Sequence, residues 1–577
     1  MKKLYFIFFA FTLFHLSNAQ VIINPGDDIQ LAVNANPSGT TFIIKSGVHR
    51  LQDVNPKTGD SFIGEKGTIM NGSMVLTNWT FDGTYWSIGG QTQQGQQGGF
   101  CVTAYPGCIY AEDLFINDLP LTHVVNLSDV ATGTWYFDYN NDKVYMKDDP
   151  TGKKVEIGTA RRAFGGSADN VTIKNIVIEK YAIPAQMGAI GDQYPGKNWI
   201  IENNEVRWNH GTGLNADGTF VYKGNYVHHN GQKGIGGTGK GGLVDSNEVS
   251  YNNWAGYDAG WDGGGSKFAN SQNLTVTNNF VHHNTGPGLW TDINNIYTLY
   301  EGNLVEDNTD AGIFHEISYD AIIRCNTVRR NGVGFDVWAW GSQIQIAASP
   351  NVKVFNNTVE VGNGKGNGIF LIQQIRGTGT YGKYVCVNDS VYQNEIYYMG
   401  TNGNSGSVGD LGENPKLGTD NYFNGNTFHI TDVNNYQFSW AVVNLNRAIN
   451  WTELQGYGQE ANGSIDNNIY ATPKKFPGCS KSVSTDIRKN NATSLLTVYP
   501  NPTDGRSTQL VMNSAISGNY TISIVDLAGR IVYQANASCT AGAEQTLNLS
   551  LEDCSKGMYL LNFEIDGTSN RLKLIKE

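Results

Sequence analysis

The sequence is poor in charged residues, and this scarcity excludes a disordered chain. Of its 577 residues only 16% are charged, whereas 40% are hydrophobic, and disordered chains show the opposite balance. The net charge is −12. The chain therefore lacks the basic character that binding to nucleic acid requires, and no nucleic-acid partner is expected. A polyanionic substrate is not excluded, because a local basic patch can occur on an acidic protein.

Long apolar runs are also lacking, apart from one at the N-terminus. A pair of lysines precedes the apolar stretch 4–16, and small residues stand at positions 17 and 19. This order predicts a signal peptide over residues 1–19, with cleavage before Gln20 and export of the chain. A membrane anchor is the alternative, but the stretch is shorter than the ~20 residues that a span needs. No membrane span is expected.

Cysteine is scarce, with seven residues and no C-x-x-C spacing of the kind that binds zinc. We therefore expect no metal and no cofactor. Export permits disulfides, and two pairs lie close enough in sequence to form, Cys101 with Cys108 and Cys539 with Cys554. The odd number leaves at least one free thiol.

Glycine, by contrast, is abundant. It accounts for 69 residues, against the ~7% that is usual, but without the G-X-Y period of collagen. Aromatic residues reach 11%, which is typical both of proteins that stack on sugar rings and of large β proteins.

The strongest internal signal is a repeated Asn-x-Val motif. Its valines follow one another at intervals of 21, 22, 32, 24, 23 and 31 residues, which indicates a base period near 22 with two insertions. A second Asn stands three residues after most of these valines, and a Gly with an apolar residue comes next. The motif valines are Val206, Val227, Val249, Val281, Val305, Val328 and Val359.

Short apolar strands repeated at this period predict a solenoid of strands. Leucine-rich repeats are excluded because their L-x-x-L-x-L spacing is absent. We therefore predict an all-β fold built on a right-handed parallel β-helix. Each valine should stack on the next at about 4.8 Å, and the asparagines should form structural ladders along the turns.

The same signal divides the chain into parts. Residues 20–75 should form an N-terminal cap with a short amphipathic helix and the first coils. Residues 76–157 interrupt the repeat with Trp- and Tyr-rich alternating strands, which predicts a small inserted β subdomain. The catalytic β-helix region follows over 158–470, with its regular coils ending near residue 440. Residues 471–492 have the composition of a linker, and residues 493–577 alternate as in a small C-terminal β-sandwich.

The last 85 residues carry four motifs: Y-P-N-P at 499–502, D-L-A-G-R at 526–530, a G-x-Y strand at 557–559 and a basic tail. By these motifs the segment resembles the C-terminal sorting domain of the type IX secretion system of Bacteroidetes. The resemblance implies the type IX secretion machinery as a partner. It also implies transport through the periplasm and across the outer membrane, with release or attachment at the cell surface.

Acidic residues recur at equivalent positions of consecutive coils. The residue after the coil Gly points inward, so the second and fourth residues after it point outward. Asp292 and Glu316 should therefore lie side by side, with backbones about 4.8 Å apart. The fourth positions read Asp217, Thr238, Asp292, Glu316 and Trp338, and the second positions read Asn215, Gly236, Trp290, Phe314 and Asp336.

Two carboxyls at this separation favour glycoside hydrolysis. Retaining glycosidases hold their carboxyls about 5–5.5 Å apart, and inverting ones about 6.5–9.5 Å. Repulsion between them keeps a proton on one, which can act as the acid while the other stays ionised. We expect Asp292 and Glu316 to be catalytic. The alternative is a pair of solvated surface acids, which the flanking Trp290 and Phe314 disfavour.

Two long coils add candidates beside this pair. One carries a Gly-rich run with Asp262 and Lys267, and the other carries Trp338 and Trp340. Long loops of this kind form the walls of binding clefts, although a flexible turn explains the glycines equally well. The predicted substrate-binding residues are Trp290, Phe314, Trp338, Trp340, Asp262, Lys267, Asp217 and His315.

The histidines give weaker signals. The pairs 228–229 and 282–283 lie two coils apart, about 10 Å, which is too far for one metal ion. His315 adjoins Glu316, but regular alternation points its ring inward and favours a buried, hydrogen-bonded histidine.

Four motifs support an enzymatic function: L-F-I-N-D at 114–118, G-T-W-Y-F-D at 133–138, G-L-W-T-D at 288–292 and G-I-F-H-E at 312–316. By these motifs, residues from about 25 to 470 resemble right-handed β-helix glycoside hydrolases of the β-xylosidase and lacto-N-biosidase kind. The resemblance implies that Asp292 is the nucleophile and Glu316, 24 residues later, is the acid/base of a retaining mechanism.

Two other functions stay open. β-Helix proteins include lyases and C5-epimerases of uronic-acid polymers, which need a basic cluster or a Ca²⁺ ion beside the base. The outward columns show acids and aromatics instead, since Arg324, Arg329 and Arg330 fall at other registers. A non-catalytic carbohydrate-binding surface protein is the third possibility. We expect a monomer acting on a poly- or oligosaccharide whose sugar, linkage and exo or endo cleavage the sequence leaves open.

Overall fold

The computed structural model describes residues 20–193, 195–333, 338–364, 366–410, 420–443, 448–476, 479, 495–499, 508–513, 518–526, 530–539, 544–552, 554–565 and 568–576. The predicted signal peptide lies outside these residues. The chain divides into two compact units, residues 1–483 and 484–577, and the division falls inside the predicted linker.

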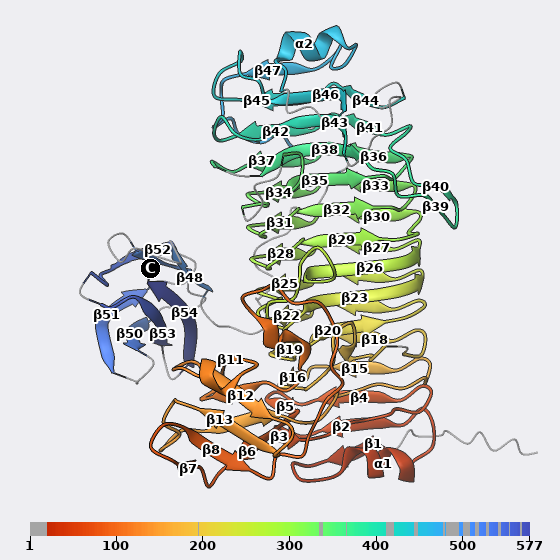
Figure 1. Ribbon diagram of the computed structural model, residues 1–577. Coiled ribbons are helices and arrows are strands. Elements are labelled where there is room, and N and C mark those ends of the chain that lie inside the picture. Colours follow the sequence, from red (N-terminus) through yellow and green to blue (C-terminus); the bar gives the residue numbers. More distant parts are fainter. Residues whose placement is uncertain are drawn as a thin grey trace, which may run out of the picture. The chain divides into compact units, whose positions relative to one another are not determined.

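The first unit is a right-handed parallel β-helix, as the repeat predicts (Figure 1). From β15 on, the coils contribute short strands to three parallel sheets in the order sheet A, sheet B, sheet C, whereas the coils before β15 have strands in sheets A and B alone. The coils begin at residue 20, so the N-terminal segment supplies the first strands of sheets A and B.

The strands of sheet A are β1 (Gln20–Ile23), β2 (Thr41–Ile44), β4 (Ser61–Gly64), β15 (Thr172–Lys174), β18 (Ile200–Glu202), β21 (Val221–Lys223), β24 (Leu243–Asp245), β27 (Thr275–Thr277), β30 (Thr298–Glu301), β33 (Ala321–Arg324), β36 (Val352–Phe355), β41 (Ser390–Tyr392) and β44 (Tyr422–Asn424). Those of sheet B are β3 (Gly47–Arg50), β5 (Thr68–Asn71), β16 (Val177–Glu179), β19 (Glu205–Arg207), β22 (Tyr226–His228), β25 (Glu248–Ser250), β28 (Phe280–His282), β31 (Leu304–Glu306), β34 (Thr327–Arg329), β37 (Thr358–Val361), β42 (Glu395–Tyr398), β45 (Thr427–His429) and β47 (Ser464–Asp466). Those of sheet C are β17 (Gly188–Ile190), β20 (Thr212–Ala216), β23 (Lys233–Lys240), β26 (Gly264–Gln272), β29 (Leu289–Asp292), β32 (Ile313–Glu316), β35 (Ser342–Ala347), β38 (Asn367–Gln373), β43 (Ser405–Gly409) and β46 (Phe438–Val443).

The valine stack is confirmed in every step. The seven motif valines, from Val206 to Val359, pair in register between neighbouring strands of sheet B. They are fully buried in one continuous core that runs the length of the β-helix. Because these side chains are β-branched and apolar, each coil buries the same surface against the next.

The asparagines form two hydrogen-bonded ladders at the turns on either side of sheet B. In the first ladder Asn247 donates through its backbone N–H and its side-chain amide to Asn279 Oδ1, at 2.9 and 3.0 Å. The same pattern continues to Asn394 and Asn426, where Glu460 accepts in place of another asparagine. The ladder thus satisfies buried backbone donors that the sharp turns leave unpaired.

Each end of the β-helix carries a short helix (Figure 1). Helix α1 (Ile29–Ala35) begins at Asp28, whose side chain accepts from Leu31 N at 2.9 Å. Helix α2 (Trp451–Gly456) begins with a capping box formed by Asn450 and Glu453. Apolar residues of both helices join the β-helix core, so the helices cover the ends of the core.

The interruption after residue 72 is the predicted inserted β subdomain. One of its sheets contains β6 (Ser73–Leu76), β14 (Val155–Gly158), β9 (Leu114–Ile116) and β10 (Leu119–Pro120). The other contains β7 (Thr80–Phe81), β8 (Trp86–Gly89), β13 (Lys143–Met146), β12 (Thr134–Asp138) and β11 (Thr122–His123). The 3₁₀ turn Pro106–Ile109 lies between β8 and β9 of the two sheets, and the 3₁₀ turn Leu127–Asp129 lies between β11 and β12. The subdomain has its own core around the buried Trp135.

The disulfides are partly as predicted. Cys101 and Cys108 are bonded, but Cys554 is free, so the expected Cys539–Cys554 pair is wrong. A bridge that the sequence did not reveal joins Cys325 to Cys479, 154 residues apart. The segment before Cys479 runs back along sheet B, where Lys474 N donates to Glu395 Oε2 at 2.5 Å. The first part of the predicted linker is therefore fixed to the β-helix.

The second unit is the expected β-sandwich. One antiparallel sheet contains β48 (Leu495–Tyr499), β49 (Thr508–Asn513) and β52 (Glu544–Leu549), and the other contains β51 (Ile531–Cys539), β50 (Gly518–Asp526), β53 (Gly557–Ile565) and β54 (Thr568–Lys576). Buried residues of both sheets form one core. Asp526 and Arg530 pair at 2.7 Å across the D-L-A-G-R turn, while most of the Y-P-N-P motif lies outside the described residues.

Candidate functional site

Asp292 and Glu316 lie side by side on the outer face of sheet C. They end the adjacent strands β29 and β32 and are paired in register, as are Trp290 and Phe314. Neighbouring strands bring their backbones to about 4.8 Å. Both side chains are nearly buried, with exposed fractions of 6% for Asp292 and 7% for Glu316. The two predicted catalytic carboxyls are therefore adjacent and largely shielded from water.

A cation pairs with each carboxyl. Lys267 Nζ lies 2.9 Å from Asp292 Oδ2 and 3.8 Å from the centre of the Trp290 ring. Arg376 Nη1 lies 2.5 Å from Glu316 Oε1. The other oxygen of Asp292, Oδ1, is buried and has no hydrogen-bond partner among the residues that the structure describes. Because a buried carboxylate oxygen is costly to leave unpaired, this atom is the one best suited to meet a substrate.

The environment raises the pKa of Glu316. Burial raises the pKa of Glu316 above its usual range, and the charge of Asp292 raises it further, while Arg376 and then Lys267 oppose the rise. Asp310, a buried carboxyl just before β32, has its pKa raised to about 7, chiefly by burial. Sequence reasoning missed Asp310 because it precedes the coil Gly and lies outside the outward columns.

An aromatic cluster packs beside the pair. It contains Trp290 and Phe314, with ring centres 5.4 Å apart and planes at 10°, and Trp340 meets Phe314 edge-on at 6.2 Å. Trp290 and Phe314 are almost fully buried, whereas Trp338 and Trp340 are half-buried. The first two residues therefore form the packed surroundings of the site, and the second two offer the accessible aromatic surface.

The placement of Trp338 corrects the predicted column. Glu316 pairs with Ala347, and Phe314 pairs with Gln345, both in β35. Trp338 thus belongs to the loop that precedes this strand, although it still packs against the aromatic cluster. Asp336, the last residue of the predicted second-position column, lies outside the described residues.

Two predicted substrate-binding residues do not lie beside the carboxyl pair on the outer face. His315 is fully buried inside the coil, where its ring bonds Thr291 Oγ1 at 2.7 Å and Tyr319 O at 2.9 Å, and burial lowers its pKa to about 4. His315 therefore cannot contact a substrate. Asp217 follows β20, which is three strands away from β29 in sheet C, or about 14 Å, so it lies apart from the pair and stays a predicted substrate contact.

Asp262 and Lys267 are held by protein partners. Both oxygens of Asp262 accept from Lys233 Nζ, at 2.7 and 2.8 Å, and only 2% of the residue is exposed. Lys267 donates to the Trp261 carbonyl at 2.6 Å besides contacting Asp292. Lys267 thus lies at the site, but as the partner of Asp292 and not as the free donor that we expected.

A cross-coil hairpin supplies the residues that the sequence did not reveal. Strands β39 (Thr378–Gly379) and β40 (Gly382–Lys383) form its stem after β38. It reaches back to the coil of β29, where Tyr384 OH donates to Asn294 Oδ1 at 2.8 Å. The chain entering the hairpin carries Gln374 and Arg376, bonded to each other at 3.0 Å. The sequence signal for this hairpin is the 37-residue interval between Val359 and Ile396, which exceeds the base period of about 22 residues and indicates an insertion.

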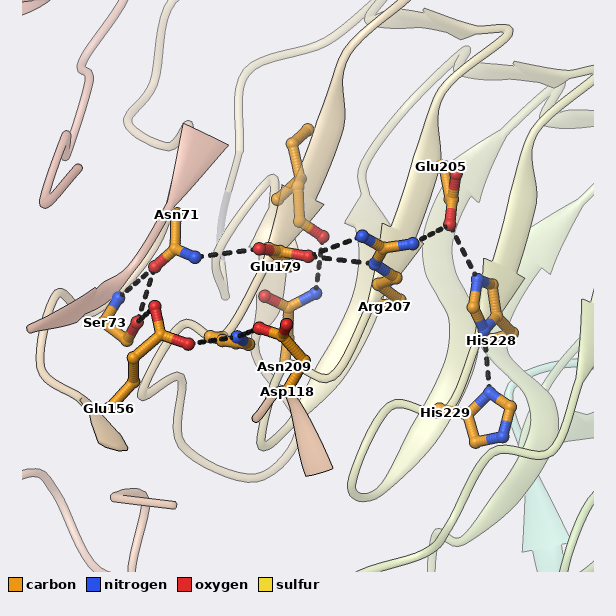
Figure 2. Close-up of polar contacts among 12 residues, drawn as sticks. Asn71, Ser73, Asp118, Glu156, Glu179, Glu205, Arg207, Asn209, His228 and His229 are labelled. Carbon is orange, nitrogen blue, oxygen red and sulfur yellow. Dashed lines mark hydrogen bonds and ion pairs between the residues drawn. The ribbon is translucent and has the colours of Figure 1, made fainter. Parts of the chain in front are cut away.

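A second concentration of charge lies on sheet B, away from this pair (Figure 2). A chain of contacts links Glu179 to Arg207 and Arg207 to Glu205, and ends in His228, which accepts from or donates to His229 at 2.7 Å. These groups bond to one another along neighbouring strands, which is consistent with a structural network. Within the described ranges no group of three or more His, Cys, Asp or Glu residues is placed to hold a metal ion.

Two cavities lie away from the carboxyl pair. One, of about 20 Å³, lies between the inserted subdomain and the β-helix beside His210 and Asp113. The other lies at sheet A beside Tyr392 and Tyr422. Neither contains a carboxyl pair on adjacent strands, so the site on sheet C remains the candidate.

Comparisons with known proteins agree with the fold. Residues 192–349 match the right-handed β-helix region, and residues 497–577 match the secretion system C-terminal sorting domain. The chain therefore carries a type IX sorting domain and is a secreted or cell-surface protein. No helix in the described part is long and apolar enough to cross a membrane. No curated protein matches the sequence.

Several solved structures are similar to this chain at low identity, and XylC shares its fold. XylC, whose structure was determined in complex with xylose, is 15% identical with a TM-score of 0.58, covering 96% of this chain and 100% of its own. The A-module of the Azotobacter vinelandii mannuronan C-5 epimerase AlgE6 is 14% identical with a TM-score of 0.43, covering 78% and 100%. DFA-IIIase from Arthrobacter chlorophenolicus A6, in complex with GF2, is 12% identical with a TM-score of 0.37, covering 75% and 99%.

Proposed function

We propose that this protein is a secreted glycoside hydrolase that cleaves a poly- or oligosaccharide with retention of configuration. The observation that carries the proposal is the pairing of Asp292 and Glu316 in register on adjacent strands. Strand spacing sets their backbones at about 4.8 Å, which is close to the 5–5.5 Å that retaining enzymes need between their carboxyls.

The two carboxyls take different roles because their environments differ. Asp292 is ion-paired through Oδ2, which leaves Oδ1 to attack the anomeric carbon. Glu316, whose pKa is raised by burial, donates its proton to the leaving oxygen as the glycosidic bond breaks. A glycosyl ester on Asp292 results. Glu316 then takes a proton from water, whose oxygen attacks the same carbon and frees Asp292.

The substrate class is a glycan whose terminal or internal sugar can reach the half-buried Trp338 and Trp340. Indole rings present flat apolar faces that suit the C–H face of a sugar ring. Because XylC, which has the same fold, was solved with xylose, aryl xylosides and xylo-oligosaccharides are the first substrates to test, followed by a wider glycan panel.

The test replaces each carboxyl with its amide. Asp292→Asn should abolish turnover on every substrate, because no glycosyl ester can form. Glu316→Gln should lower kcat by about 10²–10⁴-fold on substrates with poor leaving groups, since it removes the acid. Activated aryl glycosides should be partly spared, and azide should restore turnover by giving a glycosyl azide of retained configuration.

A matched control is Glu301→Gln. Glu301 also pairs with a cation on the adjacent strand, Arg324 at 3.1 Å, but on sheet A. The Glu301→Gln variant should have the activity of the wild type. Full activity in Asp292→Asn, or a product of inverted configuration, would show that the retaining assignment is wrong.

A lyase or C5-epimerase of uronic-acid polymers is the second candidate, and the structure adds one observation in its favour. Lys267 and Arg376 bring two cations to the carboxyl pair, where the sequence columns showed none. Both cations already pair with Asp292 and Glu316, so the carboxylate of a uronate would have to displace these two side chains from the cations. An unsaturated product absorbing near 235 nm would identify a lyase, because elimination forms a C4=C5 double bond that hydrolysis does not form, whereas new reducing ends appear in both reactions.

A further inference from the structure

The inserted subdomain contacts a loop that precedes Lys267 through a disulfide-closed segment. Residues 98–108, here called the strap, lie between β8 and β9 and are closed by the Cys101–Cys108 bond. The strap pairs with residues 256–262 of the β-helix, here called the Trp261 loop. Val102 N donates to Gly256 O at 2.9 Å, and Asp258 N donates to Phe100 O at 2.8 Å. The pairing is antiparallel, as between two strands.

Side-chain packing makes this contact tight. The ring of Phe100 meets the ring of Trp261 nearly at a right angle, with centres 5.3 Å apart. A Cβ on Gly99 would lie 2.6 Å from the ring of Tyr257 and 2.9 Å from that of Trp261, and Gly99 has a φ of +106°. Only glycine fits such a position without displacing its neighbours. The strap and the Trp261 loop are thus packed directly against each other.

The Trp261 loop in turn fixes Lys267. The Trp261 carbonyl accepts from Lys267 Nζ at 2.6 Å, and the same ammonium lies 2.9 Å from Asp292 Oδ2. The ammonium also lies over the ring of Trp290. The loop is anchored from its other side, because Asp262 is buried in an ion pair with Lys233.

A lysine ammonium needs such partners to hold one position. Its four-carbon stem carries about 2 kcal/mol of rotamer entropy, so the Asp292 contact alone does not determine the geometry. With Trp261 O on one side and the Trp290 ring on the other, Lys267 holds Asp292 by Oδ2 and leaves Oδ1 unpaired. Catalytic groups need placement of this kind, because a misplacement of about 1 Å can cost 10²-fold in rate.

We propose that Lys267 is a positioning residue for Asp292 and that the strap of the inserted subdomain sets its place through the Trp261 loop. The inserted subdomain then belongs to the catalytic apparatus and not only to the scaffold. The expected changes in kcat rest on the proposed function. The contact of the strap with the Trp261 loop does not depend on that function.

The test is a double-mutant cycle on the full-length protein. Lys267→Met should lower kcat by about 10–10²-fold with KM changed less than threefold, because the lost contact orients the nucleophile. The Cys101→Ser/Cys108→Ser variant should lower kcat by about tenfold. In the Lys267→Met background, opening the strap should lower kcat no further, because both changes act through one ammonium.

The second disulfide of the protein provides the control. Cys325→Ser/Cys479→Ser removes the other disulfide and should leave kcat unchanged. Additive losses in the cycle, or wild-type kcat in the opened strap, would overturn the proposal. If the opened strap fails to fold, Gly99→Ala displaces the same contact without touching the disulfide, and the same losses are expected.

Hydrogen exchange separates this inference from the proposed function. Reduction of Cys101–Cys108 should speed exchange at residues 256–262 and leave β29 and β32 protected. Unchanged exchange in this loop contradicts the proposal whatever the activity. A wild-type protein that cleaves no glycoside would refute the proposed function alone, while the exchange data would still decide whether the strap holds the loop.

Discussion

Removing Arg376 should move the basic limb of the pH–rate profile upward. Arg376 opposes the rise that burial and Asp292 impose on the pKa of Glu316. The Arg376→Met variant therefore raises that pKa further. Because Glu316 must be protonated to act as an acid, activity should persist to higher pH.

The magnitude follows from the geometry of the ion pair. Two charges 4 Å apart interact by about 1 kcal/mol in water and by about 4 kcal/mol at an effective dielectric constant of 20. The Arg376 Nη1–Glu316 Oε1 distance is 2.5 Å, but the arginine side chain is 35% exposed. Solvent screening therefore favours the lower figure. A loss of about 1 kcal/mol corresponds to a shift of about 0.7 pH unit.

The assay is kcat/KM against pH on an aryl glycoside, since this ratio reports ionisation in the free enzyme. Arg324→Met is the matched control, because Arg324 pairs with Glu301 on sheet A at 3.1 Å. The control profile should coincide with that of the wild type. A basic limb that stays in place or moves downward in Arg376→Met would refute the assignment of Glu316 as the acid.

Two further predictions concern stability. Asn279→Ala should lower the free energy of unfolding in urea by about 3–4 kcal/mol, because it removes bonds to Val244 O and Asn303 Oδ1 and leaves Asn247 N without its acceptor. The control Asn462→Ala, at an exposed position, should stay within about 0.5 kcal/mol of the wild type. Equal losses in the two variants would contradict a structural ladder. Burial lowers the pKa of His315 to about 4, so the stability it contributes is present above its unfolded pKa of about 6.5 and is lost as the pH falls toward 4. The free energy of unfolding should therefore fall less between pH 7 and pH 4 in His315→Gln than in the wild type, and parallel curves would show that this histidine does not titrate on unfolding.

The repeat made the fold and the carboxyl pair predictable. Residues one period apart in regular coils occupy the same register, so the alignment of Asp292 with Glu316 follows from counting alone. Counting failed at the next coil. The predicted column set Trp338 beside Glu316, yet the residue that pairs with Glu316 is Ala347 of β35. A glycine followed by an apolar residue gives the same sequence signal wherever it occurs, so counting from glycines alone cannot identify the coil position.

The cations of the site could not be predicted in the same way. Arg376 reaches Glu316 through a hairpin that crosses coils, and Lys267 is held by a loop that packs against another subdomain. Neither contact is fixed by register, because each depends on where an insertion folds back. The disulfide between Cys325 and Cys479 was missed for the same reason.

The arrangement of charges also fits the two opposite tasks that a retaining mechanism sets for Glu316. In the first step it must hold a proton, and the ionised Asp292 beside it raises its pKa. Once Asp292 carries the sugar as an ester, that negative charge is gone, while Lys267 and Arg376 still lower the pKa of Glu316. With its pKa lowered in this way, Glu316 is held as the carboxylate, which is the form that takes a proton from water in the second step. The two cations therefore matter most in the intermediate, where burial still opposes the ionisation of Glu316.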